Sequence, residues 1–240
     1  MSISKLLATT ATGVLLATSA SAFAADTVYG KDFGNGSSHT TAINGTDVTF
    51  SAKTGNNKNK LIEGKFSYKP AQDGYQGVGV SPLKGSDVTV GEIDKNEWIF
   101  AEFNDSRVIS NLTLGLLFDG PEYGDSKEKA FITVTYFDDT TKEFKLQAQG
   151  ETTALWTGGF GTVSNLSPAS DGLGGVWSID NPFGDNAVKS FVLTSHADKS
   201  DFTLYSVTAV PEPESYAMLA LGLGLVGFMA RRRDRSNLYV

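Results

Sequence analysis

The stretch Arg107-Val-Ile-Ser-Asn-Leu-Thr-Leu-Gly-Leu-Leu-Phe118 indicates the fold class of this 240-residue chain. Apolar side chains recur there at every second position, which is the period of a β-strand with one buried face: Leu112, Leu114, Leu116 and Phe118. The same alternation runs from Ile132 to Tyr136, and the residues after it, Asp138-Asp139-Thr140-Thr141, are typical of a turn. The sequence therefore predicts antiparallel strands joined by a hairpin.

Other segments of similar length are rich in Val, Ile, Thr, Phe and Tyr and lie between turn residues. They are residues 47–52, 61–68, 77–81, 97–103, 142–148, 175–179, 188–195 and 202–210. Residues 55–60 and 166–175 are expected to be loops, and no long stretch between the chain ends has helical periodicity. Many short strands separated by turns predict an all-β domain, a jelly-roll-like β-sandwich over residues 25–210.

The charge of this domain restricts its partners. Of the 20 Lys and Arg residues, 15 lie within residues 26–214, against 26 of the 27 Asp and Glu residues, so the net charge there is 15 − 26 = −11. Such an acidic domain is not expected to bind nucleic acid. The absence of cysteine excludes disulfides and cysteine catalysis, and two histidines, His39 and His196, argue against a multi-histidine zinc site.

The N-terminus has the composition of a secretory signal peptide. Lys5 precedes a short apolar run from Leu6 to Ala17, and small residues follow it. Cleavage is expected after Ala22, Ala24 or Ala25, and we favour Ala24, which gives a signal peptide over residues 1–24. The chain is therefore expected to pass through the secretion translocon.

The C-terminus has three parts in a fixed order. Pro211-Glu212-Pro213 is followed by an uncharged apolar run over residues 215–230 and then by a basic stop, Arg231-Arg232-Arg233. Sixteen helical residues rise roughly 24 Å, somewhat less than a bilayer core of about 30 Å, and flanking arginines can offset the difference. The run is expected to be a transmembrane helix with its C-terminal end in the cytoplasm.

This tripartite tail resembles the PEP-CTERM sorting signal of Gram-negative bacteria, here over residues 211–233. The resemblance implies processing by the membrane protease exosortase. Between about residues 60 and 210, three stretches are similar to the ectodomains of a subset of PEP-CTERM proteins: Gly77-Val-Gly-Val80; Glu92-Ile-Asp94 with Glu97 and Phe103; and Gly115-Leu-Leu-Phe-Asp-Gly-Pro-Glu-Tyr123. That similarity implies a β-sandwich without an established enzymatic activity.

Two acidic clusters are candidates for cation binding. One contains Glu92, Asp94 and Glu97; the other, Asp119, Glu122 and Asp125, lies in a loop whose glycines free the backbone. Calcium takes six to eight hard oxygen ligands, which such loops supply. We favour the second cluster for calcium, and the alternative for both is a solvated acidic turn.

Aromatic residues offer a different chemistry. Trp98 and Trp177 fall in predicted strands and are expected in the core, whereas Trp156, beside a glycine-rich stretch, is the best candidate for an exposed aromatic that contacts carbohydrate. No nucleophile-elbow motif accompanies either histidine, and sequence alone cannot show the carboxyl pair that a glycosidase needs.

These observations favour a non-enzymatic exported protein. It is expected to be anchored in the inner membrane, processed by exosortase, and then released to or attached at the cell surface or extracellular matrix, where exopolysaccharide is a possible partner. The alternatives are a carbohydrate-binding module, with or without calcium, and a secreted glycan-active enzyme.

Overall fold

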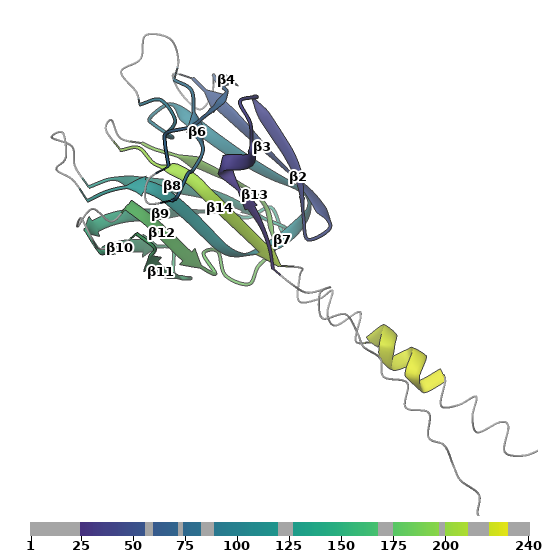
Figure 1. Ribbon diagram of the computed structural model, residues 1–240. Helices are drawn as coiled ribbons and strands as arrows, with labels where there is room; N and C mark the ends of the chain where they lie inside the picture. Colours follow the sequence, from purple (N-terminus) through teal and green to yellow (C-terminus); the bar gives the residue numbers. More distant parts are fainter. Residues whose placement is uncertain are drawn as a thin grey trace, which may run out of the picture.

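The computed structural model describes residues 25–55, 60–71, 74–82, 89–119, 127–167, 175–196, 200–210 and 221–229. The strands are β1 (Asp26–Tyr29), β2 (Ser38–Ile43), β3 (Thr46–Thr54), β4 (Ile62–Glu63), β5 (Phe66–Ser67), β6 (Gly79–Val80), β7 (Glu97–Leu117), β8 (Lys129–Tyr136), β9 (Thr141–Gly150), β10 (Thr153–Thr157), β11 (Thr162–Asn165), β12 (Gly175–Asp180), β13 (Val188–Thr194) and β14 (Thr203–Val210). One turn of 3-10 helix, η2 (Gly30–Asp32), follows β1. The all-β prediction is therefore confirmed (Figure 1).

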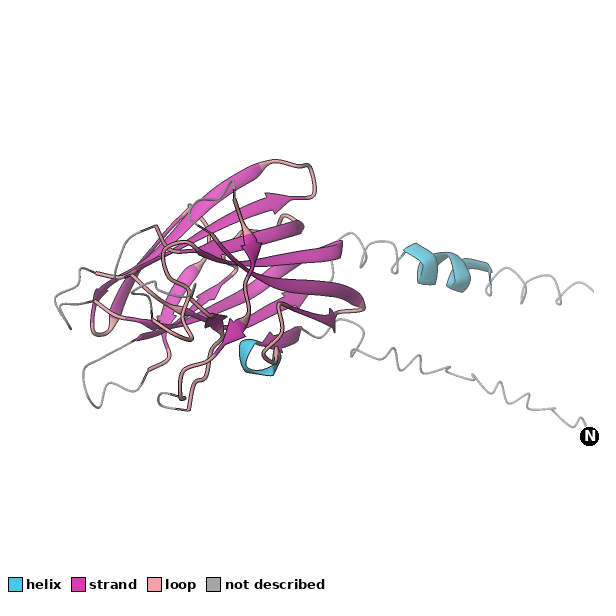
Figure 2. Cartoon of the chain, turned by 90° about the horizontal axis from the view of Figure 1, so that it is seen from above, coloured by secondary structure: helices cyan, strands magenta, loops and turns pink. Residues whose placement is uncertain are grey.

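The long strand β7 organises the sheet, because its two halves pair with different neighbours. Residues 97–103 pair with β3 on one side and β13 on the other, which extends through β8, β9 and β10. Residues 108–117 pair with β14 and β12, which extend to β1 and β11. All these pairings are antiparallel, and the strands curl around the interior of the domain (Figure 2). A jelly-roll strand order stays a prediction.

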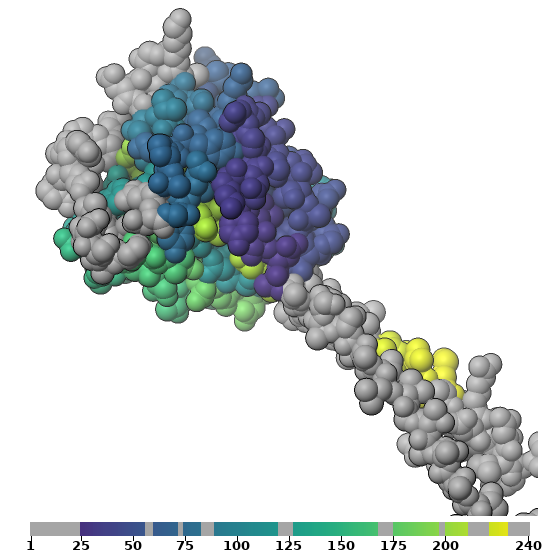
Figure 3. Space-filling model, viewed as in Figure 1, coloured from purple at the N-terminus to yellow at the C-terminus, as the bar shows by residue number. Residues whose placement is uncertain are grey.

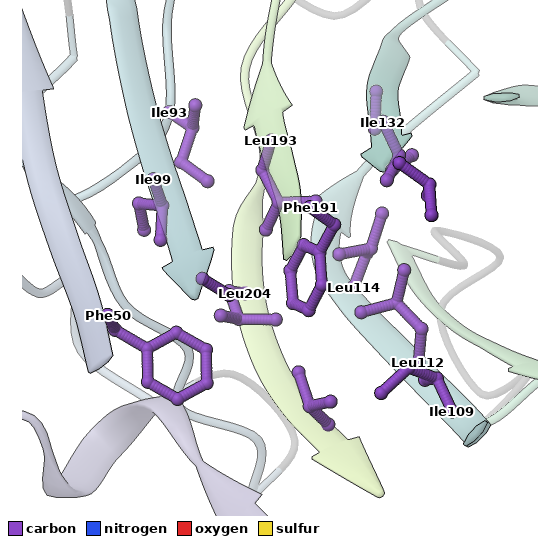
Figure 4. Close-up of a cluster of buried hydrophobic side chains, with 14 of the residues drawn as sticks. Phe50, Ile93, Ile99, Ile109, Leu112, Leu114, Ile132, Phe191, Leu193 and Leu204 are labelled. Atoms are coloured by element: carbon purple, nitrogen blue, oxygen red, sulfur yellow. The ribbon is translucent and has the colours of Figure 1, made fainter. Parts of the chain in front are cut away.

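One hydrophobic core fills the interior of the curled sheet. It combines Phe50 and Ile99 from one half with Leu112 and Leu204 from the other, and all four are fully buried. Figure 4 shows the labelled side chains of both halves converging around Phe191 of β13. Trp98 and Trp177 are buried, as predicted.

The alternation predicted for residues 112–118 breaks at Leu116. Leu116 has a φ of 55°, and the pairing of β7 with both neighbours shifts register near this point. A bulge places two residues opposite one and reverses the faces beyond it. Leu117 therefore takes the core position, while Leu116 and Phe118 are only partly buried, so the prediction was wrong for these two residues.

Four short strands, β1, β2, β10 and β11, were not predicted. Three of them, β2, β10 and β11, have few buried apolar residues, so no strong period-two signal marks them. β2 joins β3 through Asn44-Gly45, whose φ values of 48° and 77° fit the two-residue hairpin that this dipeptide favours. In Figure 3 these N-terminal residues, coloured purple and blue, form one side of the domain.

The terminal segments are described in part. The predicted signal peptide, residues 1–24, lies outside the described residues, as do residues 211–220 and 230–240, including the Pro-Glu-Pro and triple-arginine motifs. Residues 221–229 are helical. No helix in the described ranges is long and apolar enough to span a membrane.

Candidate functional site

The strand β14 has two functionally different ends. It begins just after Asp201, where several acidic residues gather, and it ends at Val210, immediately before the predicted sorting segment. Its eight residues separate the two places by about 25 Å. We call them the acidic end and the exit end of the domain.

At the exit end, the last residues of β14 are held on both sides. Val210 pairs with Val108 of β7, and Ala209 pairs with Asp26 of β1. The side-chain amide of Asn44 donates a hydrogen bond to the carbonyl of Ala209, and the Asn44 backbone N–H donates to Asp26 Oδ2 at 3.1 Å. The β-sheet pairing therefore extends to Val210, the residue before Pro211, and β1 begins beside it (Figure 1).

The helix over residues 221–229 is apolar and exposed along its whole length. Its large side chains, Leu221, Leu223, Leu225, Val226, Phe228 and Met229, are between 42% and 66% exposed. A continuous exposed apolar surface of this kind marks a site of contact with a membrane or a partner. It falls inside the predicted apolar run over residues 215–230.

At the acidic end, the fold gathers five carboxyl groups that are far apart in the sequence. We call them the carboxyl cluster: Glu92, Asp94, Glu97, Glu128 and Asp201. Asp201 shares side-chain hydrogen bonds with both Glu92 and Glu128, and its charge also acts on Asp94 and Glu97. The first three were grouped in the sequence analysis, whereas Glu128 and Asp201 were missed.

Backbone hydrogen bonds fix the position of the segment that carries Glu92, Asp94 and Glu97. The Ile93 N–H donates to the carbonyl of Phe202 at 2.7 Å, and Val80 N–H donates to the carbonyl of Glu92 at 2.8 Å. The second contact requires Gly79, because a Cβ there would lie 2.3 Å from the backbone of Glu92. Further along, Glu97 Oε2 accepts from the Asp94 N–H at 3.0 Å and closes the turn before β7.

Glu128 joins the opposite end of β7 to the same place. Its N–H donates to the carbonyl of Phe118 at 3.1 Å, and its Oε2 accepts from the Phe118 N–H. The next residue, Lys129, is held by the Ser200 hydroxyl, whose Oγ accepts from the Lys129 N–H at 2.6 Å and donates to the Lys129 carbonyl at 3.1 Å. Because Asp201 follows Ser200, these bonds bring Glu128 and Asp201 together.

Burial dominates the electrostatics of the cluster. It is the largest cause that raises the pKa of Glu92 to about 8, of Glu97 to about 8, of Asp94 to about 6 and of Glu128 to about 10. The charge of Asp201 raises all four further. Lys69 acts in the opposite direction through an ion pair with Glu92, whose Nζ–Oε1 distance is 2.7 Å.

Some oxygens of the cluster have no partner. Glu92 Oε2 and Glu97 Oε1 are buried without a hydrogen bond, in residues that are 4% and 2% exposed. Among the described residues, no three acidic or histidine side chains are already arranged as a metal site. The cluster is therefore a set of buried acids that is incompletely satisfied.

The favoured calcium residues fall largely outside the described ranges. Asp119 is described and partly buried, whereas Glu122 and Asp125 are not described, so calcium binding by these three stays a prediction. The loop that carries them starts after Phe118 and ends before Glu128, and these two residues are bonded to each other. Asp119, the described member of that cluster, therefore follows Phe118 at the same end of the domain as Glu128.

Trp156 is less exposed than expected. It is half-buried, its ring stacks on Phe144 with centroids 5.4 Å apart, and its Nε1 is buried without a partner. The prediction of an exposed aromatic is wrong for Trp156, because Phe144 draws the ring against the core; its contact with carbohydrate stays a prediction. The nearby Phe160, in contrast, is 41% exposed.

Phe160 lines a groove of about 630 Å³ at the exit end. The groove also includes Val108, which pairs with Val210. Its other chemically distinctive residues are Phe137, Asp138, Lys142, Asp185 and Asn186. Phe137 is 72% exposed, and Lys142 Nζ lies 4.5 Å from the centre of the Phe160 ring. The groove therefore combines open aromatic rings with carboxylate, amide and ammonium groups.

The two histidines lie on separate elements. His39, on β2, stacks on Phe33 at 4.8 Å, and His196, after β13, contacts the edge of Phe131 at 4.3 Å. Both contacts are packing interactions with a phenylalanine.

A comparison with protein families explains the exit end. A model described as the PEP-CTERM protein-sorting motif matches residues 209–233. The chain carries a PEP-CTERM motif. This match confirms the resemblance seen in the tail, and it begins within the last two residues of β14. A PEP-CTERM motif marks an exported protein that exosortase processes at the cell envelope. No curated protein and no solved structure matches the chain.

Proposed function

We propose that this chain is a non-enzymatic exported protein that acts at the cell surface or in the extracellular matrix. The secretion translocon would deliver it, residues 215–230 would hold it in the inner membrane, and exosortase would process it at Pro211-Glu212-Pro213. The released or attached part is then the β domain, residues 25–210, with exopolysaccharide as its partner in a biofilm matrix.

The observation that carries this proposal is the PEP-CTERM motif that directly follows β14. The ordered ladder continues to Val210, so cleavage near Pro211 releases a complete domain. The exposed apolar side chains of residues 221–229 and the basic residues after them suit a membrane segment with a cytoplasmic stop. The acidity of the domain, −11 over residues 26–214, suits a matrix that is rich in cations.

The test is the intact mass of the protein in each cell fraction. Wild type should appear as a species without residues 1–24 and without the apolar helix. Replacement of Pro211, Glu212 and Pro213 by alanine should leave a membrane-bound form that keeps its C-terminus. The matched control replaces three exposed neighbours by alanine, Glu151 and Thr152 of a surface turn and Thr153 at the start of β10, and should be processed normally. Normal processing of the motif variant would contradict the proposal.

The groove at the exit end favours a second candidate, carbohydrate binding. Sugar rings stack on exposed aromatic faces and bond to carboxylate and amide groups, and the groove offers Phe137, Phe160, Asp185 and Asn186 for these contacts. Lys142 of the groove also lies over Phe144, with Nζ 5.1 Å from the ring centre, and the Trp156 ring stacks on Phe144.

A panel of polysaccharides distinguishes the candidates. Phe137→Ala with Phe160→Ala should abolish retention on the polysaccharide that wild type binds, whereas Trp156→Phe, which keeps an aromatic ring against Phe144, should retain it. Absence of retention in wild type rejects the carbohydrate candidate and leaves the sorting proposal intact. Release of soluble sugar that stops when single carboxyl groups are replaced would instead establish a glycan-active enzyme.

A further inference from the structure

The carboxyl cluster brings five acidic side chains together, four of them in buried residues. Its members come from three separate parts of the chain: the segment before β7, the start of β8 and the start of β14. Lys69 pairs with Glu92 and so balances one of the five charges. Buried carboxylates are costly unless they are paired, protonated or bound to a metal ion.

Buried oxygens without a partner occur in the segment before β7, at the start of β7 and at the end of β3. Glu97 Oε1, in a residue that is 2% exposed, has no hydrogen bond, and neither has Glu92 Oε2. Thr54, the last residue of β3, lies directly opposite Glu97 in the β3–β7 ladder. Opposite residues of an antiparallel pair project to the same face, and Thr54 Oγ1 is also buried without a partner. A neutral hydroxyl and two carboxyl oxygens therefore face the cluster without any bond.

The chemistry of these donors selects the class of ligand. All five cluster members and Thr54 offer oxygen, and the chain has no cysteine. Calcium accepts six to eight oxygens in irregular geometry, and carboxylates can bind it through one or both oxygens. Magnesium demands a tight octahedron and keeps its water, so it fits a flexible group of buried glutamates less well.

We propose that the carboxyl cluster binds one calcium ion, which ties the segment before β7 to the starts of β8 and β14. Glu92, Glu97, Glu128 and Asp201 supply carboxylate oxygens, and Thr54 supplies a hydroxyl. The side chains are not yet arranged as a metal site, so they rotate as the ion enters. As the ion binds, the protons of the Glu92 and Glu128 carboxyl groups pass to solvent.

This site differs from the loop that the sequence analysis favoured. The ends of the Asp119–Asp125 loop adjoin the cluster through Phe118 and Glu128, but the proposed ligands lie outside that loop. Two sets of substitutions can therefore assign an ion to one site or the other.

The test uses the full chain, purified in detergent and freed of metal with EDTA, followed by dialysis. Calcium titration by calorimetry should show one site. At a hundredfold excess over Kd, the melting temperature should rise by roughly 5–10 °C, because the ion binds the folded state. Glu97→Gln and Glu128→Gln, which keep the shape of a protonated side chain, should each weaken calcium binding at least tenfold. Glu143→Gln, on the exposed face of β9, should bind like wild type.

A loop variant and a sodium control distinguish this site from the Asp119–Asp125 loop and from a general effect of salt. Asp119→Asn with Asp125→Asn should retain binding, and sodium at matched ionic strength should cause no shift. No heat of binding in wild type at millimolar calcium overturns the proposal, whether or not the variants fold. Unchanged binding in both Glu97→Gln and Glu128→Gln overturns it too, and loss of binding in the loop variant moves the ion to the loop.

Discussion

The N–H of Ile93 donates to the carbonyl of Phe202 at 2.7 Å, across more than a hundred residues of sequence. This bridge sets the residues on either side of Ile93, Glu92 and Asp94, beside Asp201. Its geometry depends on β14, which continues from Phe202 to the sorting motif. The strand that presents the motif at one end is thus anchored by buried acids at the other.

The stability of the metal-free protein should fall as the pH rises. Free glutamate has a pKa near 4.5, whereas burial raises the pKa of Glu92 and of Glu97 to about 8 and that of Glu128 to about 10. Between these values the folded state holds more protons than the unfolded state, so each step up in pH favours unfolding. The contribution of these groups is complete below about pH 4.5 and is lost through about pH 8 to 10.

Urea unfolding in EDTA at a series of pH values measures this dependence. Other groups that face the cluster, Lys69 and Asp201, are included in the total slope. Glu97→Gln should reduce the loss of stability between pH 5 and 9, since glutamine stays neutral, whereas the exposed Glu143→Gln should leave it unchanged. Stability that stays level or increases over this range would show that the cluster is ionised in the folded protein.

Gly79→Ala should destabilise the domain. A Cβ at this position would lie 2.3 Å from backbone atoms of Glu92, which cannot move without breaking the Val80–Glu92 contact. Overpacking of this kind costs roughly 1–3 kcal/mol. Gly36→Ala is the control, because its nearest atom would be 3.4 Å away, and it should cost little. Equal stability of the two variants, measured by urea unfolding, would refute the close approach.

Replacing a core phenylalanine and a groove phenylalanine by alanine should change stability by very different amounts. Phe191 is fully buried and contacts the rings of Phe50, Phe103 and Phe183, so Phe191→Ala should cost roughly 3–5 kcal/mol. Phe137 is 72% exposed in the groove, and Phe137→Ala should change stability by about 0.5 kcal/mol or less. Thermal unfolding checks both, and a large loss in Phe137→Ala would mean that the groove wall is structural.

Sequence periodicity predicted the strands that have one apolar face and one polar face. The alternation from Ile132 to Tyr136 is buried as expected, and the turn after it joins β8 to β9. β2 was missed because serine and threonine occupy half of it, although the Asn44-Gly45 turn was a usable signal for a hairpin. The bulge at Leu116 could not be foreseen, because it depends on how two neighbouring strands pair with β7.

Only those residues of the candidate site that are close together in the sequence could be predicted. Glu92, Asp94 and Glu97 lie within six residues and were grouped together. Glu128 and Asp201 join them through pairings between distant segments, which no short-range pattern reports. The sorting motif was recognised from sequence because its three parts are contiguous, and the family comparison confirmed it.

The Asn44 side chain should stabilise the pairing of the last residues of β14 at the exit end. Its side-chain amide donates to Ala209, the second-to-last residue of β14, and its backbone adopts a φ of 48°, which glycine also accepts. Asn44→Gly therefore removes the side-chain bond and keeps the turn. A hydrogen bond of this kind contributes about 1 kcal/mol.

Hydrogen exchange measures this loss. Exchange of the hydrogen-bonded amides in residues 208–210 should accelerate roughly fivefold, while exchange of those near Leu204 should not change. Asp139→Gly, in the β8–β9 turn with a φ of 63°, serves as the control; it removes an exposed ion pair with Lys189 and should leave β14 unaffected. If the closed end limits access to Pro211, Asn44→Gly should also add species trimmed before Val210 to the intact-mass spectrum. Exchange at wild-type rates in Asn44→Gly would show that the pairing with Val108 and Asp26 alone holds the strand.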